Sequence, residues 1–366
     1  MRLRTAATGT VTALGVAALL ALAGCSGSGG SPSATAPAAT ASPTVKASSS
    51  PVALGSGPAA ALQQQYEEVI RTVLPSVVQI NTQTGTGSGV VYDGNGDIVT
   101  NAHVVGDATN VQVVPATGGA TLQAKVLGSF PPDDLAVIRV TSGGGSLPKA
   151  TFGESANITA GQIVLAMGNP LGLTGSVTQG IISATGRTVS EAGASGGGSV
   201  TIANALQTSA AINGGNSGGA LVNLAGQVIG IPTAAARDPE AGAAPGIGFA
   251  IPSDTVTNIA DQLISKGKVT ESTRAAIGIT GHTTVTPDGQ PAGVAISSVT
   301  DGGAAAAAGL RPGDVITKVA GHETPTQGVL TAVLANLKPG QQVEVTYIRD
   351  NTSHTANVTL GHLASG

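Results

Sequence analysis

The chain has 366 residues, of which only 10% are charged, and its formal net charge is −4. This length leaves room for two domains, and the lack of a basic cluster argues against nucleic-acid binding. Aromatic residues make up 2% of the chain and Trp is absent, so the cores must be filled with Val, Ile, Leu and Ala. Together with the 54 Gly residues, this composition favours a β-rich, turn-rich protein over a helical one.

The N-terminus has the pattern of an export signal. Met1-Arg-Leu-Arg4 is basic, a mostly apolar run follows, and Leu22-Ala-Gly-Cys25 brings small residues before a cleavage point. The segment resembles a bacterial lipobox, which implies that residues 1–24 are a lipoprotein signal peptide and that Cys25 carries a lipid. A plain signal peptide with a chance cysteine is the alternative. Because Cys25 is the only cysteine, no intrachain disulfide is possible.

A tether is expected to follow the lipid-bearing cysteine. Residues 26–60 are almost entirely Ser, Gly, Pro, Ala and Thr, a composition that cannot build a core. We therefore expect residues 25–60 to form a disordered tether with a mean reach of about 30–35 Å. Such a tether would let an anchored catalytic body sample the space above the bilayer.

Residues 61–267 are expected to form the first folded domain. An amphipathic helix is predicted near Gln63–Leu74, ending before Pro75. Short β-type runs then alternate with turns and no helix lies between them, which predicts a barrel or sandwich. The predicted strands are Val77–Thr82, Ser88–Tyr92, Asp97–Thr100, Val111–Val114, Leu122–Leu127, Leu135–Val140, Gln162–Ala166, Ser176–Ala184, Val200–Ala203, Gly219–Val222, Gln227–Ile231 and Gly246–Ile251.

Ser217 is the candidate nucleophile. It lies in Gly215-Asn-Ser-Gly-Gly219, where missing Cβ atoms leave the hydroxyl accessible and let nearby N–H groups point inward. A nucleophile with an oxyanion hole requires such a setting. A Gly-rich hairpin turn with an incidental serine is the alternative for this pentapeptide alone.

A serine needs a positioned base, and the choice of imidazole is narrow. His103 is the only histidine before His282, and it follows an apolar, β-branched run at the end of a predicted strand. Asp134 is the best-placed carboxylate to orient the ring, because it stands at the mouth of an apolar strand. We expect the neighbouring Asp133 to be solvated.

An α/β-hydrolase is the main rival on motif grounds. Gly215-x-Ser217-x-Gly219 fits the nucleophile-elbow consensus, but that elbow needs a helix directly after the serine. Residues Ala220–Ile231 instead indicate a β-hairpin around Leu224-Ala-Gly226. The pattern therefore argues against a lipase or esterase.

Five motifs in order make the chain resemble the HtrA/DegP-like trypsin-fold serine proteases. They are Thr100–Val105, Asp134–Ile138, Met167–Gly172, Gln207–Leu221 and Gly246–Pro252. The resemblance implies a mainly β fold, a chymotrypsin-like double β-barrel of two six-stranded barrels with the catalytic triad in the cleft between them. The order His103, Asp134, Ser217 is that of the chymotrypsin type.

The resemblance also assigns roles around the triad. It implies an oxyanion hole from the N–H groups of Gly215 and Ser217. Its alignment places Ala211, Ile212 and Thr233 at the specificity pocket, which favours cleavage after small or medium aliphatic residues. The strand Ile231–Ala234 should pair with the substrate backbone.

Two residues depart from the family pattern, and one loop is singled out. Ser209 replaces the usual Asp, and Pro232 stands where Asn is expected and supplies no N–H. These changes put the ordering of the pocket loops in doubt. The Gly-rich stretch 188–199 is either an exposed loop or, as the family implies, a sensor that switches the oxyanion hole.

The C-terminal part is predicted to be a separate domain. A helix over Ser253–Gly267, with Ser253 as N-cap, should close the catalytic domain, and residues 268–274 form a linker. Residues 275–363 resemble a PDZ domain, a small β-barrel capped by helices. Ile277, Gly278 and Ile279 match its carboxylate-binding loop, and Leu330 and Val333 are candidates to face a bound peptide.

Thr326 is expected to cap the second PDZ helix. The four C-terminal histidines are scattered over loops and strand ends, which argues against a metal site. The triad chemistry requires no cofactor, and the chain carries none of the known metal-binding motifs.

The sequence therefore predicts an exported, lipid-anchored serine endopeptidase facing outside the cytoplasm, at the cell surface or in the periplasm. Its expected partners are misfolded or C-terminally exposed protein substrates, and family resemblance implies a homotrimer. A PDZ-bearing chaperone or sensor with a dormant triad is one alternative, and a dedicated signalling protease is another.

Overall fold

A computed structural model describes residues 57–169, 175–191, 200–238 and 242–365. The predicted signal peptide, Cys25 and nearly all of the tether lie outside these ranges, as does most of the proposed sensor loop 188–199. Within the described ranges, no helix is both long enough and apolar enough to cross a membrane.

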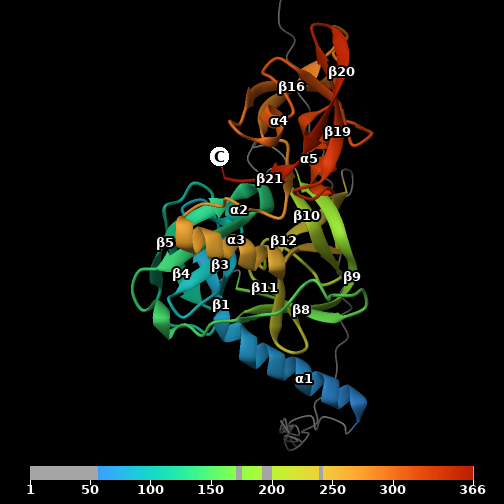
Figure 1. Ribbon diagram of the computed structural model, residues 1–366. Helices are drawn as coiled ribbons and strands as arrows, with labels where there is room; N and C mark the ends of the chain where they lie inside the picture. Colours follow the sequence, from blue (N-terminus) through green and yellow to red (C-terminus); the bar gives the residue numbers. More distant parts are fainter. Residues whose placement is uncertain (1–56, 170–174, 192–199, 239–241, 366) are drawn as a thin grey trace, which may run out of the picture. The chain divides into compact units, whose positions relative to one another are not determined.

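The described chain begins with a helix that leads into the first strand (Figure 1). Helix α1 spans Pro58–Val73, and a 3₁₀ turn, η1, continues it over Leu74–Ser76. The helix starts before the predicted Gln63 because Pro58 occupies its first turn, where a missing N–H costs nothing. Val69 and Val73 are buried in the core of the catalytic domain.

A closed barrel of six antiparallel strands follows, in the order β1-β2-β3-β6-β5-β4. Two short helical elements lie between these strands: α2 at Ala102–Val105 contains His103, and η2 at Pro131–Asp133 directly precedes Asp134. The strands are β1 Val77–Asn81, β2 Thr86–Val91, β3 Asp97–Thr100, β4 Asn110–Pro115, β5 Leu122–Phe130 and β6 Leu135–Val140. A further 3₁₀ turn, η3, spans Gly144–Ser146.

The second sheet has the order β11-β8-β9-β10-β13-β12-β7, and a β11–β12 pairing closes six of its strands into a ring. This arrangement confirms the predicted pair of six-stranded barrels. The strands are β7 Thr151–Phe152, β8 Ile163–Gly168, β9 Ser176–Glu191, β10 Val200–Thr208, β11 Ala220–Asn223, β12 Gln227–Asp238 and β13 Gly242–Pro252.

Both barrels are filled mostly by Val, Ile, Leu and Ala side chains, as the composition requires, together with Phe130, Phe249 and Met167. One buried cluster is shared by α1, both barrels and helix α3, which spans Ser253–Lys266. Figure 1 shows α3 running across the domain, from β5 of the first barrel to β12 of the second. Because the cluster crosses the boundary between the barrels, it fixes the two halves that carry the proposed catalytic residues.

The start of α3 differs from the prediction. Pro252 occupies the N-cap position and no side chain caps the helix. The hydroxyl of Ser253 instead donates a 2.6 Å hydrogen bond to the Gly153 carbonyl. The predicted end is confirmed, because Gly267 adopts the left-handed conformation with φ of 70°.

The C-terminal domain has a sheet of the order β15-β16-β17-β19-β20, with β18 paired to β17 and a separate β14–β21 pair. Thr326 caps α5 as predicted, accepting a hydrogen bond from the Val329 N–H at 3.2 Å. The elements are β14 Ala275–Ala276, β15 Ile279–Val285, β16 Pro291–Val299, α4 Ala304–Ala307, β17 Val315–Val319, β18 His322–Glu323, α5 Gln327–Ala335, β19 Gln342–Arg349, β20 Thr352–Thr359 and β21 Gly361–His362.

Candidate active site

Ser217 lies in the loop between β10 and β11, with only 6% of its surface exposed. The next residue, Gly218, has a φ of 81°, and a Cβ there would stand 2.2 Å from the Ser88 carbonyl oxygen. Its N–H donates to the Pro232 carbonyl at 2.9 Å. Glycine is therefore required directly after the serine, because the loop passes against the first barrel.

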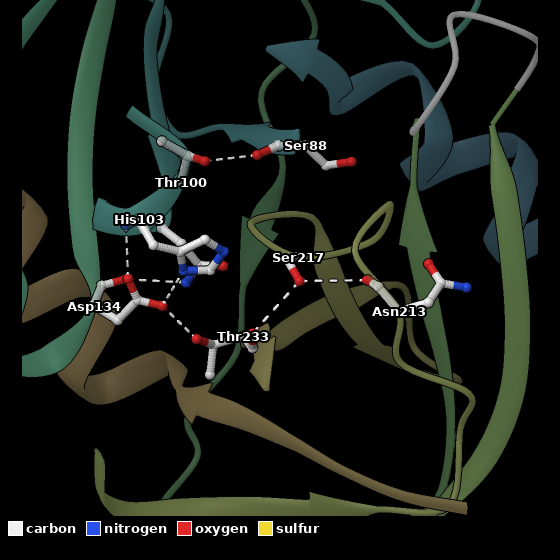
Figure 2. Close-up of polar contacts among 8 residues, drawn as sticks. Ser88, Thr100, His103, Asp134, Asn213, Ser217 and Thr233 are labelled. Carbon is white, nitrogen blue, oxygen red and sulfur yellow. Dashed lines mark hydrogen bonds and ion pairs between the residues drawn. The ribbon is translucent and has the colours of Figure 1, made fainter. Parts of the chain in front are cut away.

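His103 and Asp134 are joined by two hydrogen bonds (Figure 2). The ring Nδ1 lies 2.8 Å from Asp134 Oδ2, and the backbone N–H of His103 donates to Oδ1 at 2.9 Å. A carboxylate only accepts hydrogen bonds, so it favours the tautomer with the proton on Nδ1. Nε2 is then the nitrogen that can accept a proton, as a general base requires.

Asp134 is held by its backbone as well as its carboxylate. It adopts a left-handed conformation with φ of 51° and ψ of 42°. Its carbonyl oxygen accepts hydrogen bonds from the N–H of Ala102 at 3.1 Å and from Nδ2 of Asn101 at 3.0 Å. These contacts tie the acid to the short helix that carries His103.

Thr233, which the resemblance assigns to the specificity pocket, contacts the proposed triad acid. Its hydroxyl donates a short hydrogen bond to Asp134 Oδ2, as Figure 2 shows, and its side chain is buried. Thr233 therefore orients the carboxylate, and its hydroxyl is not free to line a specificity pocket. No local pattern in the sequence signals this contact, because the two residues are 99 positions apart.

The hydroxyl of Ser217 is placed against two backbone carbonyls. Its Oγ lies 3.3 Å from the Asn213 oxygen and 3.4 Å from the Thr233 oxygen (Figure 2). The N–H of Gly215 donates to the side-chain oxygen of Asn213 at 3.0 Å. One of the two expected oxyanion donors is thus occupied within its own loop, so the open oxyanion hole is not formed in this conformation.

Ser88 connects the first barrel to the serine loop, a role that sequence reasoning missed. Its hydroxyl donates to the Gly215 carbonyl at 2.7 Å and accepts from the Asn169 N–H at 2.8 Å. Its own N–H donates to the Ser217 carbonyl at 2.9 Å, and its carbonyl accepts from the Thr100 hydroxyl at 2.6 Å. A buried serine in Gly-Ser-Gly on a predicted strand was the only sequence signal.

Of the other two residues expected at the specificity pocket, Ala211 is exposed and Ile212 is partly exposed, and neither carries a charge. The Ala211 carbonyl accepts from Thr178 Oγ1 and from Asn216 Nδ2, each at 2.9 Å. The side chain of Ile212 packs against Gly248, where a Cβ would meet Ile212 Cγ1 at 2.3 Å. An aliphatic wall is therefore present beside the serine loop.

Ser209 and Pro232, which depart from the family pattern, each accept a backbone hydrogen bond. The hydroxyl of Ser209 accepts a hydrogen bond from the Ile181 N–H at 3.0 Å. Pro232 pairs with Ala250 in the β12–β13 ladder, and its carbonyl accepts from Gly218. Ser209 therefore helps hold β9, and Pro232 contributes an acceptor to the serine loop.

Asp133 is buried, which contradicts the expectation that it is solvated. Only 2% of its surface is exposed, and Oδ1 lies 3.4 Å from Nη1 of Arg274. Burial raises the pKa of the Asp133 carboxyl to about 6, although the Arg274 guanidinium acts in the opposite direction. The local sequence Pro-Pro-Asp-Asp suggested a surface turn because the partner comes from the distant linker.

The residues predicted for the peptide groove of the C-terminal domain differ in burial. Gly278 has a φ of 81°, and β15 after it is an end strand of its sheet. Ile277 is 1% exposed and packs in the domain core together with Leu330, and Val333 packs against that core. Val329, which is 37% exposed, is the large apolar side chain that α5 presents to solvent.

The helix and the strand that would flank such a groove are joined at one end. The N–H of Gln327, the first residue of α5, donates to Thr283 Oγ1 on β15 at 3.0 Å. The open edge of β15 therefore runs beside α5, as binding by strand addition requires.

Comparisons with known proteins agree with this architecture. Residues 87–231 match the trypsin-like peptidase domain, and residues 267–360 match the PDZ domain. Serine protease PepD of Mycobacterium tuberculosis is 40% identical over 314 residues, which cover 81% of this chain and 66% of that protein. A probable periplasmic serine endoprotease, DegP-like, of Brucella suis is 39% identical over 75% of this chain and 52% of its own length.

A solved structure is similar over both domains. The HtrA-type protease AlgW with a decapeptide has a TM-score of 0.54 and 30% identity, covering 81% of this chain and 98% of that one. The chain spans about two thirds and about half of the two curated relatives, respectively. The matched domains, their order and the identity over most of the chain show that this chain belongs to the HtrA family of trypsin-like serine endopeptidases that carry a PDZ domain.

Proposed function

We propose that this chain hydrolyses peptide bonds in misfolded or C-terminally tagged exported proteins, with Ser217, His103 and Asp134 as its catalytic triad. The hydrogen-bonded pair His103–Asp134, next to a buried serine in a glycine-rich loop, is the observation that carries the proposal. A dedicated protease with one signalling substrate would use the same site.

The proposed reaction uses these three side chains in turn. Ser217 Oγ attacks the substrate carbonyl carbon while His103 Nε2 takes the hydroxyl proton. The imidazolium is stabilised by Asp134, and it then donates the proton to the leaving amine as the C–N bond breaks. Water attacks the acyl-enzyme with the same base, releasing the acid product and restoring Ser217.

The oxyanion is proposed to bind the N–H groups of Gly215 and Ser217. This requires the Gly215 N–H to leave Asn213 Oδ1, where it donates in the present conformation. An oxyanion-hole donor contributes about 2.7–4 kcal/mol to the transition state, so full activity depends on this rearrangement. Substrate binding along the strand that includes Thr233 is the event proposed to favour it.

Specificity is proposed to come from the aliphatic wall near Ala211 and Ile212. No charged side chain belongs to this pair, so a small or medium aliphatic residue before the cleaved bond fits it better than Lys, Arg or Asp. The substrate backbone would pair with residues 231–234 on β12.

The PDZ domain is proposed to bind the C-terminus of a polypeptide. The chain ending would add a strand to β15, with its carboxylate at the Ile277-Gly278-Ile279 loop. Val329 and Val333 on α5 are the proposed side-chain contacts, because Leu330 is committed to the core.

We also propose export and lipid attachment at Cys25. The predicted tether, 25–60, is shortened to 25–57 because α1 begins at Pro58, so the proposed catalytic domain is 58–267, followed by a linker at 268–274 and a PDZ domain at 275–363. The basic start and the Leu-Ala-Gly-Cys segment support export, and a DegP-like relative is described as periplasmic. A trimer is the proposed assembly by family resemblance.

Cleavage of unfolded casein tests the proposal. The chain from residue 57 onward should degrade casein, Ser217→Ala should not, and peptides with an aliphatic C-terminus should change the rate through the PDZ domain. If both proteins leave casein intact yet suppress aggregation of a client, with or without peptides, the dormant-triad chaperone reading replaces this one.

A further inference from the structure

The turn that precedes the proposed triad carboxylate needs external support. Asp134 follows the 3₁₀ turn η2 directly and adopts a left-handed backbone. For a residue with a Cβ this conformation is less favourable than the ordinary ones. The surrounding contacts must therefore hold the turn in the shape that points the Asp134 carboxylate at His103.

Arg274, from the linker, provides such a contact to the turn. Its Nη1 donates to the Pro132 carbonyl and lies 3.4 Å from Asp133 Oδ1. The side chains of Arg274 and Asp133 are 5% and 4% exposed, so water does not screen the pair. One guanidinium thus binds the two residues that immediately precede Asp134.

The backbone around Arg274 is itself held by hydrogen bonds to the C-terminal end of the PDZ domain. The Arg274 carbonyl accepts from the Leu363 N–H at 2.8 Å, and the Ser272 hydroxyl donates to the Leu363 carbonyl at 2.6 Å. The side chain of Leu363 packs against the catalytic core. Arg274 is therefore anchored at the point where the linker enters the PDZ domain.

The buried pair of Asp133 and Arg274 is not expected to add much to the stability of the fold. Within the described part of the chain, Asp133 Oδ2 and Arg274 Nε are buried without hydrogen-bond partners. A buried pair with incomplete hydrogen bonding gains little over an apolar contact, whereas removing one member leaves an unpaired buried charge. Here that charge would be one residue from the triad carboxylate.

We propose that Arg274 is a positioning residue, which fixes the η2 turn through Pro132 and Asp133 and thereby holds the Asp134 carboxylate against His103. This inference rests on the proposed triad function. It makes the interdomain linker part of the catalytic machinery, although Arg274 contacts no substrate.

Kinetics of Arg274→Gln in the full chain test the proposal with a short chromogenic peptide. Misplacement of a catalytic group by about 1 Å costs roughly 100-fold, so kcat should fall by about 10- to 100-fold while KM changes less than about twofold. Arg274→Lys, which keeps the charge, should recover part of kcat. Arg349→Gln is the matched control, because Arg349 binds Asp314 and the Gly309 carbonyl inside the PDZ domain.

A second readout does not depend on turnover. The proton between His103 Nδ1 and Asp134 should give a low-field proton NMR resonance, which Arg274→Gln should shift or broaden and Arg349→Gln should leave in place. If Arg274→Gln does not fold, the neutral pair Asp133→Asn with Arg274→Gln takes its place. A folded variant with unchanged kcat and an unchanged resonance would overturn the proposal.

The two proposals fail in different ways. A wild-type chain that cleaves no peptide would contradict the proposed function, and the resonance alone would then decide whether Arg274 positions Asp134.

Discussion

At the scale of single residues, Ser88 shows how the nucleophile loop depends on the other barrel. Its hydroxyl joins the Gly215 carbonyl to the Asn169 N–H, and all three groups are at the junction of the two barrels. Without this hydroxyl, the buried Asn169 N–H and the partly buried Gly215 carbonyl lose a partner, at a cost of about 1–3 kcal/mol.

Ser88→Ala should therefore lower kcat/KM for a peptide substrate by about fivefold or more, since about 1 kcal/mol, the lower end of this range, corresponds to a factor of about five. Ser146→Ala is the matched control, because the Ser146 hydroxyl also donates to a backbone carbonyl, that of Gly143, but in an exposed turn outside the site. Equal activity of the two variants would show that Ser88 does not position the loop.

Asp133 gives a dependence of stability on pH. Burial raises its pKa to about 6 in the folded state, against about 3.9 in an unfolded chain. Between these values the folded state binds more protons than the unfolded state, so the free energy of unfolding decreases as pH rises from about 4 to 6. Asp133→Asn should remove this part of the slope.

Urea denaturation at several pH values measures that slope. Asp107→Asn, at an exposed position, serves as the control for loss of one carboxylate. A wild-type slope in this window that Asp133→Asn leaves unchanged would show that Asp133 titrates as it does in the unfolded chain.

At this scale the triad residues could be predicted from the sequence, but the residues that support them could not. His103, Asp134 and Ser217 could be selected because each carries a local pattern and because histidine is scarce. The roles of Ser88, Thr233 and Asp133 could not be predicted, since each depends on a partner many positions away. The oxyanion donors were expected to be open, yet Asn213 accepts from Gly215 through a purely local turn.

At the scale of elements, the loop between β10 and β11 is constrained by one glycine. Gly218 has positive φ, and a Cβ would meet the Ser88 carbonyl at 2.2 Å and Thr100 Oγ1 at 2.5 Å. Both neighbours belong to strands of the first barrel and cannot move independently. A side chain at this position must therefore displace the serine loop.

Gly218→Ala should abolish labelling of the serine by a fluorophosphonate and lower the melting temperature. Gly226→Ala is the matched control, because Gly226 also has positive φ, at 74°, while a Cβ there has its nearest neighbour at 3.7 Å. The control should lose only about 1–2 kcal/mol from backbone strain and keep its labelling. Normal labelling of Gly218→Ala would contradict the steric argument.

Element boundaries were predictable where local chemistry decides them. Thr326 caps α5 and Gly267 ends α3, as their residue types indicate. The start of α3 could not be predicted, because the Ser253 hydroxyl binds the distant Gly153 carbonyl and Pro252 occupies the N-cap position.

At the scale of the whole molecule, the catalytic core extends beyond the segment assigned to it by sequence. Val269, in the linker, is buried in that core, and Leu363, near the C-terminus, packs against it. The barrels and the PDZ domain could be predicted from strand pattern and family motifs, but this packing could not, because a short polar linker carries no signal of where it lies.

Leu363→Ala should therefore destabilise the catalytic domain, by about 1–2 kcal/mol for a partly buried leucine. Calorimetry should show a lower melting temperature for the transition that also abolishes activity. Leu62→Ala, at an exposed position of α1, should leave this transition unchanged. The same melting temperature in both variants would mean that the C-terminal segment does not support the catalytic domain.

The catalytic triad is the central claim, and labelling by a fluorophosphonate tests it most directly, because the serine oxygen must displace fluoride from phosphorus with help from the imidazole. We predict that peptide mapping of the labelled chain finds the phosphonyl group on Ser217 alone and that His103→Ala, folded as shown by circular dichroism, is not labelled. A label on another residue, or equal labelling of His103→Ala, would contradict the account.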